Sequence, residues 1–307
     1  MRKCPNCFTM LSDQARFCHE CGLKVADDDK KVTCPDCGEE NPATAKFCRN
    51  CGKDVSEKRK AEELFEERPT QATENEIHAA FREHLQQKAA EEQGEKIAPA
   101  YLERLEQSDF KFSYEIKVKQ LAEDLLKNQE KPDYDAAAAH LSLHNTFENL
   151  SDFFMIFYCS DLNRIELSEK ILRWQNIDRN NIDLLQLVED YLDFGTEPGV
   201  TYYTNFVEMP LDRLRTAGKS FLFPAAEEKI LLICDQSVLG SLKEGFAFTE
   251  RGFYWRMHFE PARMVLYQNL EEINREKDWI KINGQFFNAN KSLNIKILKL
   301  LKKIKRL

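Results

Sequence analysis

The sequence predicts a multidomain α+β protein with a cysteine-rich N-terminal part, a helical middle and a C-terminal antiparallel β domain closed by a helix. Eight of the ten cysteines lie in the first 51 residues. A single glycine, Gly94, occurs between Lys53 and Phe194, and such scarcity of chain breakers favours helices joined by short loops. After Gly195 the pattern changes to short apolar segments separated by turn residues, which is typical of strands.

Length and composition restrict the class of protein. A chain of 307 residues is long enough for two or three domains. Its 31% charged and 42% hydrophobic residues are those of a globular protein, and its longest apolar run, 153–159, is too short to cross a bilayer. The first residues lead directly into a cysteine motif and leave no room for the apolar core of a signal peptide. We therefore expect a cytoplasmic protein.

Charge is distributed unevenly along the chain. Residues 1–60 hold 12 Lys+Arg and 10 Asp+Glu, residues 61–200 hold 14 and 30, and residues 201–307 hold 18 and 12. The middle of the chain is thus strongly acidic and the C-terminal part is basic. An acidic middle disfavours nucleic-acid binding by that region, although a basic protein partner would suit it.

The N-terminal cysteines form two quartets of the same spacing, and the second quartet follows the first by thirty residues. The flanking residues repeat as well: Ala15–Gly22 matches Ala45–Gly52 in most positions, which indicates an internal duplication. The quartets are Cys4, Cys7, Cys18 and Cys21, then Cys34, Cys37, Cys48 and Cys51.

Each quartet has the spacing of a metal shell. Two residues between paired cysteines let both thiolates of one tight turn bind the same ion, and two such turns complete a tetrahedral Cys₄ site for Zn²⁺. A disulfide framework is the alternative, but it does not suit a reducing compartment. Four protein ligands leave no open position, so we expect two structural zinc ions per chain. Gly22 and Gly52 should take left-handed conformations that close the second turn of each unit.

Residues 1–54 resemble the double zinc ribbon found at the N-terminus of many bacterial and archaeal proteins. The resemblance implies one ribbon in residues 1–27 and another in residues 28–54. His19 lies between two ligands but aligns with Arg49 in the other repeat, so we interpret it as a surface residue. Because basic and acidic residues are interspersed here, we favour a protein partner over nucleic acid for the ribbons.

The middle of the chain divides into a charged linker, residues 55–72, and an acidic helical domain, residues 73–200. Thr73–Glu76 reads as a capping box that starts a helix near residue 74. Apolar residues at helical spacing predict four or five packed helices. His140 and His144 are one turn apart, yet the metalloprotease glutamate is absent, so we assign them no metal or catalytic role. Cys159 is expected to be a core residue.

Residues 201–307 predict a β domain with a C-terminal helix. Candidate strands are 229–235, 244–249, 252–259, 262–267 and 277–282, and Asn283-Gly284 is a strong hairpin signal. A helix is expected over 291–306. The strand pattern resembles bacterial pleckstrin-homology-like domains of unassigned function, which implies a small antiparallel barrel-like binding module capped by a helix. No basic cluster for phosphoinositide binding accompanies the first hairpin.

The C-terminal helix has three interpretations. It carries seven Lys+Arg and no acidic residue over residues 288–307, with an apolar stripe. This composition suits a helix that caps the barrel with its lysines in water, a membrane-surface helix over residues 291–307, or a helix that docks on the acidic middle domain. We favour the cap.

No phosphate-binding loop, nucleophile elbow, HExxH or kinase motif occurs, and Cys234 has no motif-supported histidine partner. The sequence therefore predicts a zinc-binding, non-catalytic adaptor that mediates protein–protein interaction. The alternatives are a nucleic-acid-binding regulator that uses the ribbons and a peripheral membrane protein that uses the C-terminal helix.

Overall fold

The computed structural model describes residues 2–3, 10–11, 31–34, 37–42, 45, 47–53, 56–177 and 182–307. Side chains are described from residue 33 onward within these ranges, except those of residues 42 and 56–70. The chain forms two compact units. Unit 1 comprises Met1–Glu83 and Asp109–Leu143, and unit 2 comprises His84–Ser108 and His144–Leu307.

Unit 1 contains the ribbon hairpins and a pair of helices. In the N-terminal part, β1 (Arg2–Lys3) pairs with β2 (Met10–Leu11), and β3 (Lys31–Thr33) pairs with β4 (Glu40–Pro42), both antiparallel. Further on, α1 (Ser56–Gln93) packs on α3 (Phe110–Gln129) through Phe81 and Tyr114, whose ring centroids lie 4.7 Å apart. The His78 Nδ1 atom lies 2.8 Å from the Tyr114 hydroxyl, which satisfies this polar group beside the apolar contact.

The charged segment 55–72, expected to be a linker, is helical from Ser56 and forms the first half of α1. The segment is rich in Glu, Lys, Arg and Ala, which have high helix propensity, and propensity outweighs the lack of an apolar face here. Two long helices, α1 and α4 (Ala136–Tyr158), contribute to both units. The boundary expected at residue 200 therefore does not separate the two units.

Unit 2 contains two antiparallel sheets. The larger has the order β5 (Thr201–Tyr203), β6 (Ile230–Asp235), β7 (Gly245–Thr249), β8 (Gly252–Arg256) and β9 (Arg263–Leu266). The smaller has the order β10 (Ile273–Glu276), β11 (Trp279–Ile282) and β12 (Gln285–Phe287), with the predicted Asn283-Gly284 turn between its last two strands. The sheets are not closed into a barrel, so that part of the predicted fold class is wrong.

Separate elements cover the two faces of the larger sheet. The strands therefore bury their apolar side chains without closing into a barrel. On one face, α6 (Leu211–Ser220) and the residues after it place Ala217 and Phe221 against Ile233 and Tyr254. On the other face, Phe246 and Phe253 contact Phe287 of the smaller sheet, with centroids 5.7 and 5.4 Å from it. As a result β7 and most of β8 are buried on both faces.

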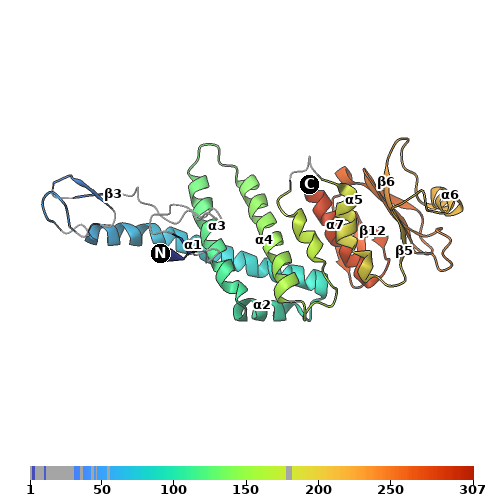
Figure 1. Cartoon of the computed structure of the whole chain (residues 1–307), viewed down its shortest axis with the longest axis horizontal. Coiled ribbons are helices and arrows are strands. Elements are labelled where there is room, and N and C mark those ends of the chain that lie inside the picture. Colours follow the sequence, from blue (N-terminus) through green and yellow to red (C-terminus); the bar gives the residue numbers. More distant parts are fainter. Residues whose placement is uncertain are drawn as a thin grey trace. The chain divides into compact units, whose positions relative to one another are not determined.

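The last helix, α7 (Lys291–Arg306), begins at an N-cap, Asn290, whose side chain accepts a hydrogen bond from the Leu293 N–H. It packs on α5 (Leu184–Leu192), β10 and β11 (Figure 1). Its apolar stripe is buried, as the capping interpretation requires, and two of its lysines, Lys296 and Lys299, are buried as well.

The remaining elements of unit 2 are short. They are α2 (Ala98–Gln107), η1 (Glu169–Trp174), η3 (Phe194–Thr196) and η4 (Tyr267–Asn269). Among the described residues, no helix combines the length and apolar character needed to span a membrane.

Candidate metal centre

The second ribbon brings its four cysteines together. The sulfur atoms of Cys34, Cys37, Cys48 and Cys51 all lie within 4.8 Å of one another. The Cys34 and Cys51 sulfurs are 3.5 Å apart, and those of Cys37 and Cys48 are 3.6 Å apart. Sulfur atoms in a tetrahedral shell with Zn–S distances of about 2.3 Å lie about 3.8 Å apart. The shell therefore fits Zn²⁺ with no rearrangement of the fold.

Two tight turns of the same geometry build this shell. The Gly38 N–H donates to the Cys34 carbonyl (3.0 Å), and the Gly52 N–H donates to the Cys48 carbonyl (2.9 Å). Gly38 and Gly52 have φ of +75° and +74°, a left-handed conformation that glycine adopts without strain. The prediction for Gly52 is confirmed. The left-handed conformation of Gly38 was not predicted, because the first repeat has Phe8 at the equivalent position and the two repeats do not share a glycine there.

Polar groups around Cys48 favour its thiolate form. The Cys51 N–H lowers the pKa of the Cys48 thiol to about 6, although burial opposes this, and the Asn50 N–H and the Asn41 amide lower it further. The Asn41 amide nitrogen lies 3.5 Å from the Cys48 sulfur, while its oxygen accepts a hydrogen bond from the Arg49 N–H. Because the thiolate is the metal ligand, these contacts assist metal binding. At Cys51 the Lys53 N–H acts in the same direction, but the Cys37 and Cys34 side chains outweigh it and raise the pKa of the thiol to about 12.

The ligand predictions have different outcomes in the two repeats. The structure brings together all four predicted ligands of the second quartet. The first quartet, Cys4, Cys7, Cys18 and Cys21, lies outside the described residues, as do His19 and Gly22. One Cys₄ centre is thus shown, and the second zinc ion remains a prediction.

Comparison with known proteins agrees with this geometry. Residues 4–56 match the family model of the double zinc ribbon. No curated protein and no solved structure was found to match the chain. The family match covers the N-terminal part only, and it supports zinc binding there.

The two histidines with metal-like spacing do not act together. His140 is exposed, whereas His144 packs against His84 of α1, with ring centroids 5.3 Å apart. Burial lowers the pKa of His84 to about 4, with smaller effects from neighbouring charges. His84 is therefore neutral at neutral pH. Among the described residues, the only cluster that could hold a metal ion is the Cys₄ shell.

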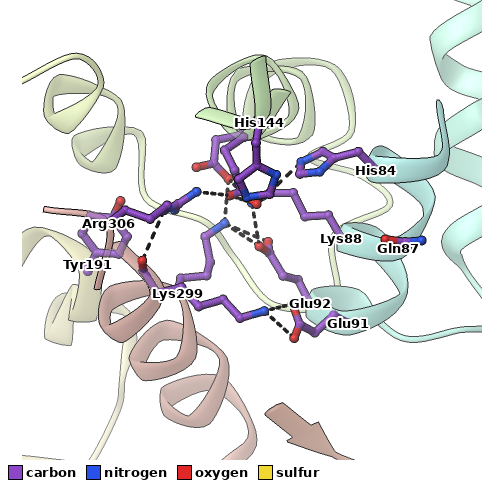
Figure 2. A pocket seen from close by; sticks show the side chains of 12 residues that line it. His84, Gln87, Lys88, Glu91, Glu92, His144, Tyr191, Lys299 and Arg306 are labelled. Atoms are coloured by element: carbon purple, nitrogen blue, oxygen red, sulfur yellow. Dashed lines mark hydrogen bonds and ion pairs between the residues drawn. The ribbon is translucent and has the colours of Figure 1, made fainter. Parts of the chain in front are cut away.

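A second cluster of functional groups lies in unit 2, beside a cavity of about 320 Å³ (Figure 2). We call it the Lys88 cluster; its members are Lys88, Glu92, Glu148, Asp152 and Lys299. The Lys88 ammonium lies 2.7 Å from Glu148, 3.1 Å from Glu92 and 3.2 Å from Asp152. The Lys299 ammonium lies 2.7 Å from Glu92 and 2.6 Å from Asp152. Every charge in the cluster thus has an opposite charge beside it.

Neighbouring opposite charges favour the ionised forms of Lys88, Glu148 and Asp152. Burial alone would lower the pKa of Lys88, but Asp152, Glu148 and Glu92 raise it well above its ordinary value. Burial would likewise raise the pKa of Glu148, yet Lys88 and Arg306 hold it well below its ordinary value. The ammonium and carboxylate groups of the cluster pair with one another inside unit 2. We interpret the cluster as structural.

Neighbouring pairs extend this arrangement along α7. Lys302 binds Glu91 at 2.6 Å, Arg306 lies 3.2 Å from Glu148, and Lys296 binds Glu197 at 2.6 Å. Docking on the acidic middle domain was one of the three interpretations of this helix, but the sequence pattern did not identify its partners. The partners are 99 to 211 residues distant in the chain, and the only local signals were the carboxylates of Glu148 and Asp152, one turn apart on a largely apolar helix.

The other cysteines lie in the core. Cys159 and Cys234 are both fully buried, and burial raises the pKa of each thiol to about 12. Neither forms a thiolate at neutral pH, which is consistent with their assignment as small apolar residues.

Proposed function

We propose that this protein is a zinc-stabilised, non-catalytic adaptor that binds another protein. The observation that carries this proposal is the closed Cys₄ shell of the second ribbon. Four sulfurs within 4.8 Å of one another occupy every position of a tetrahedral ion and leave none for water or substrate. A zinc ion of this kind stabilises a small domain, and the surface of that domain is then free to bind a partner.

An exposed aromatic residue on the second ribbon supports a protein partner. Phe47, next to the ligand Cys48, is 62% exposed. Aromatic side chains are common anchors in protein interfaces, where they fill apolar pockets of the partner. Beside it, the Arg49 guanidinium is paired with Glu39 and contributes little to a basic surface. These features favour protein over nucleic acid as the ligand of this ribbon.

We further propose that residues 201–307 form a pleckstrin-homology-like binding module. A five-stranded and a three-stranded antiparallel sheet followed by a closing helix support this proposal. The membrane alternative for residues 291–307 is less well supported, because Lys296, Lys299 and Lys302 are already bound to carboxylates within unit 2. A helix bound in this way would first have to leave its site.

The adaptor proposal is tested by affinity purification of the full chain from native cytoplasmic extract. Purification is done at two salt concentrations, with and without nuclease, and recovered proteins are quantified by mass spectrometry. We expect a stoichiometric protein partner that survives nuclease and is lost with Phe47→Asp. The matched control is Phe112→Asp, since Phe112 of α3 is 55% exposed and lies outside the ribbons.

Two results would reject the proposal. Recovery of nuclease-sensitive, salt-labile nucleic acid instead of protein would make the ribbons a nucleic-acid-binding element. Equal loss of the partner in the Phe47→Asp and Phe112→Asp variants would show that the second ribbon is not the docking surface. Zinc content is measured in each variant to confirm that the metal site is intact.

A further inference from the structure

A small polar cavity of about 130 Å³ lies within unit 2, next to the cavity of the Lys88 cluster. Its lining comes from four places in the fold: α4, the η1 helix with the turn after it, α5 and α7. Asp152, Tyr191 and Arg306 line both cavities, so the two spaces adjoin (Figure 2). We call the smaller space the Lys303 cavity. Its lining is rich in groups that can donate a hydrogen bond.

Lys303 of α7 contributes a half-buried cation to this lining. Its ammonium forms no ion pair and no hydrogen bond with any residue that the structure describes, whereas three other lysines of the same helix each bind a carboxylate. Burial lowers the pKa of Lys303, and the charge of Arg306 adds to this effect. A partly buried ammonium costs stability unless an acceptor or an opposite charge lies beside it, so this position favours an anionic ligand.

Tyr191 of α5 adds a buried hydroxyl to both cavities. The residue is 6% exposed, and its hydroxyl makes no hydrogen bond to another of the described residues. Buried tyrosine hydroxyls usually have a hydrogen-bond partner. Burial raises the pKa of Tyr191, so the hydroxyl keeps its proton at neutral pH and can donate it to a ligand oxygen.

Two asparagine amides complete the set of donors. The Asn149 amide nitrogen donates to the Asn176 side-chain oxygen at 3.2 Å, which leaves the amide nitrogen of Asn176 as its end for a further contact. Asn176 has a φ of +58°, a left-handed conformation that asparagine tolerates better than most residues. The Asn145 side chain forms no hydrogen bond within the described part of the chain. Asn145 and Asn176 both line the cavity.

The charge of the lining is positive once its internal ion pairs are taken into account. Two cations, Lys303 and Arg306, and one carboxylate, Asp152, line the cavity. The Asp152 carboxylate is already paired, since it lies 2.6 Å from the Lys299 ammonium and 3.2 Å from that of Lys88. Arg306 has five N–H donors, of which its contacts with Glu148 and with a backbone carbonyl use only a part. The cavity therefore suits a ligand that is an anion and a hydrogen-bond acceptor.

We propose that the Lys303 cavity binds the phosphate group of a small soluble molecule. The donors surround the space from four elements, and the oxygens of a tetrahedral phosphate point in several directions, whereas the two oxygens of a carboxylate lie in one plane. The adjoining cavity of about 320 Å³ has a polar lining and space for the rest of the molecule. This site belongs to unit 2 and needs no zinc, so it would add a ligand-binding function to the proposed adaptor.

The test titrates the full chain with inorganic phosphate, and separately with glycerol phosphate, at constant ionic strength by isothermal titration calorimetry. We expect saturable binding of both, with glycerol phosphate at least as tight, because the adjoining cavity accepts its glycerol group. Lys303→Met should weaken binding at least about tenfold, since a hydrogen bond between charged groups contributes on that scale. Tyr191→Phe retains the ring and should weaken binding several-fold through loss of one donor.

Lys305→Met is the matched control for the loss of charge. Lys305 lies on the same helix, is exposed and does not line the Lys303 cavity, so this variant should bind phosphate like the native chain. Urea unfolding adds a second readout. Without phosphate, Lys303→Met should be at least as stable as the native chain, because it removes a cation that has no counter-ion among the described residues. Phosphate should raise the urea midpoint of the native chain but not that of Lys303→Met.

Several results would overturn the proposal. The first is absence of saturable binding of both ligands up to tens of millimolar. Equal weakening by Lys303→Met and Lys305→Met would indicate a general effect of charge and no specific site. A lower urea midpoint for Lys303→Met with unchanged phosphate affinity would assign Lys303 a structural role. Binding to phosphatidylcholine vesicles that contain phosphatidic acid, without binding to glycerol phosphate, would show a lipid headgroup as the ligand and reject the soluble molecule.

Discussion

The ammonium of Lys299 lies 2.6 Å from Asp152 and 2.7 Å from Glu92, so one side chain of the last helix joins α7 to both α4 and α1. These partners precede Lys299 by 147 and 207 residues. An apolar stripe alone would let the helix pack on many surfaces and with several rotations about its own axis. Because Lys296 and Lys302 must meet Glu197 and Glu91 at the same time, the ion pairs select one position for the helix.

We predict that Lys299→Met destabilises unit 2 by about 3–5 kcal/mol, because it leaves Asp152 and Glu92 buried with too little compensating charge. The methionine side chain has similar length and preserves packing, so the loss reports on charge. Unfolding by urea, followed by tryptophan fluorescence and circular dichroism, measures the change. The double variant Lys299→Met with Asp152→Leu should recover part of the loss, since it removes a carboxylate together with its partner.

The control for this prediction is Lys127→Met. Lys127 pairs with Glu123 at 3.8 Å, but its side chain is 71% exposed. An exposed pair of this kind contributes little, so we expect a change within about 0.5 kcal/mol. Equal losses of stability in Lys299→Met and Lys127→Met would contradict the interpretation that the buried ion pairs of the Lys88 cluster hold α7 in place.

A second prediction concerns pH. Burial lowers the pKa of His84 from its ordinary value of 6.5 to about 4 in the folded protein. Between these values the unfolded chain binds a proton at this position that the folded chain does not, so stability falls as the pH drops from about 7 toward 4. We expect His84 to account for about 1–3 kcal/mol of this loss.

The variant His84→Gln should flatten the pH dependence of urea unfolding between pH 7 and pH 5. His140→Gln, at an exposed position, is the matched control and should retain the native slope. The lowered pKa of Glu148 affects folding stability in a different pH range. The stability that this group contributes is fully present above its unfolded pKa near 4.3 and is lost only as the pH falls below that value. A slope for His84→Gln that equals the native slope would disprove the assignment.

The parts of the fold that could be predicted are those with strong local signals. The cysteine spacing identified the four residues of the Cys₄ shell in the second ribbon, and Asn283-Gly284 identified the turn between β11 and β12. The strand predicted over 252–259 contains β8. Tyr254 of β8 is only 2% exposed because α6 covers it. Sequence reasoning did not predict α6, which is a short helix with three apolar residues, Leu211, Leu214 and Ala217.

Long-range contacts explain what sequence reasoning missed. No local pattern pairs Lys299 with Glu92 or Asp152, since their proximity depends on how α1, α4 and α7 pack. The same holds for the two sheets, where the contact of Phe287 with Phe246 and Phe253 decides that the strands form two layers instead of a barrel. Periodicity identifies the elements and their apolar faces, but it does not identify their partners.

A third prediction concerns metal content. The intact chain should contain two zinc ions, and Cys48→Ser and Cys18→Ser should each contain one, because each removes one ligand from a different shell. Elemental analysis by mass spectrometry after extensive dialysis measures this. Cys234→Ala is the control: its thiol is buried in β6, so zinc content should stay at two. Iron in place of zinc, or one ion in the native chain, would be incompatible with the double ribbon.

The last prediction concerns the register of the larger sheet at Gly245, the first residue of β7. Gly245 has a φ of +155°, and a Cβ atom at this position would lie 2.2 Å from the Cys234 carbonyl oxygen of β6. The clash involves backbone in two buried strands, so it cannot be relieved by moving a side chain. We expect Gly245→Ala to destabilise unit 2 by about 2–4 kcal/mol.

Gly218→Ala is the matched substitution for this test. Gly218 lies within α6, where an added Cβ meets nothing within 4 Å. Alanine has the higher helix propensity, so this change should stabilise the protein by about 0.5–1 kcal/mol. The urea midpoints of the two variants should thus shift in opposite directions. A shift of Gly245→Ala as small as that of Gly218→Ala would mean that β6 and β7 do not pair with the close backbone approach at Cys234 that the structure shows.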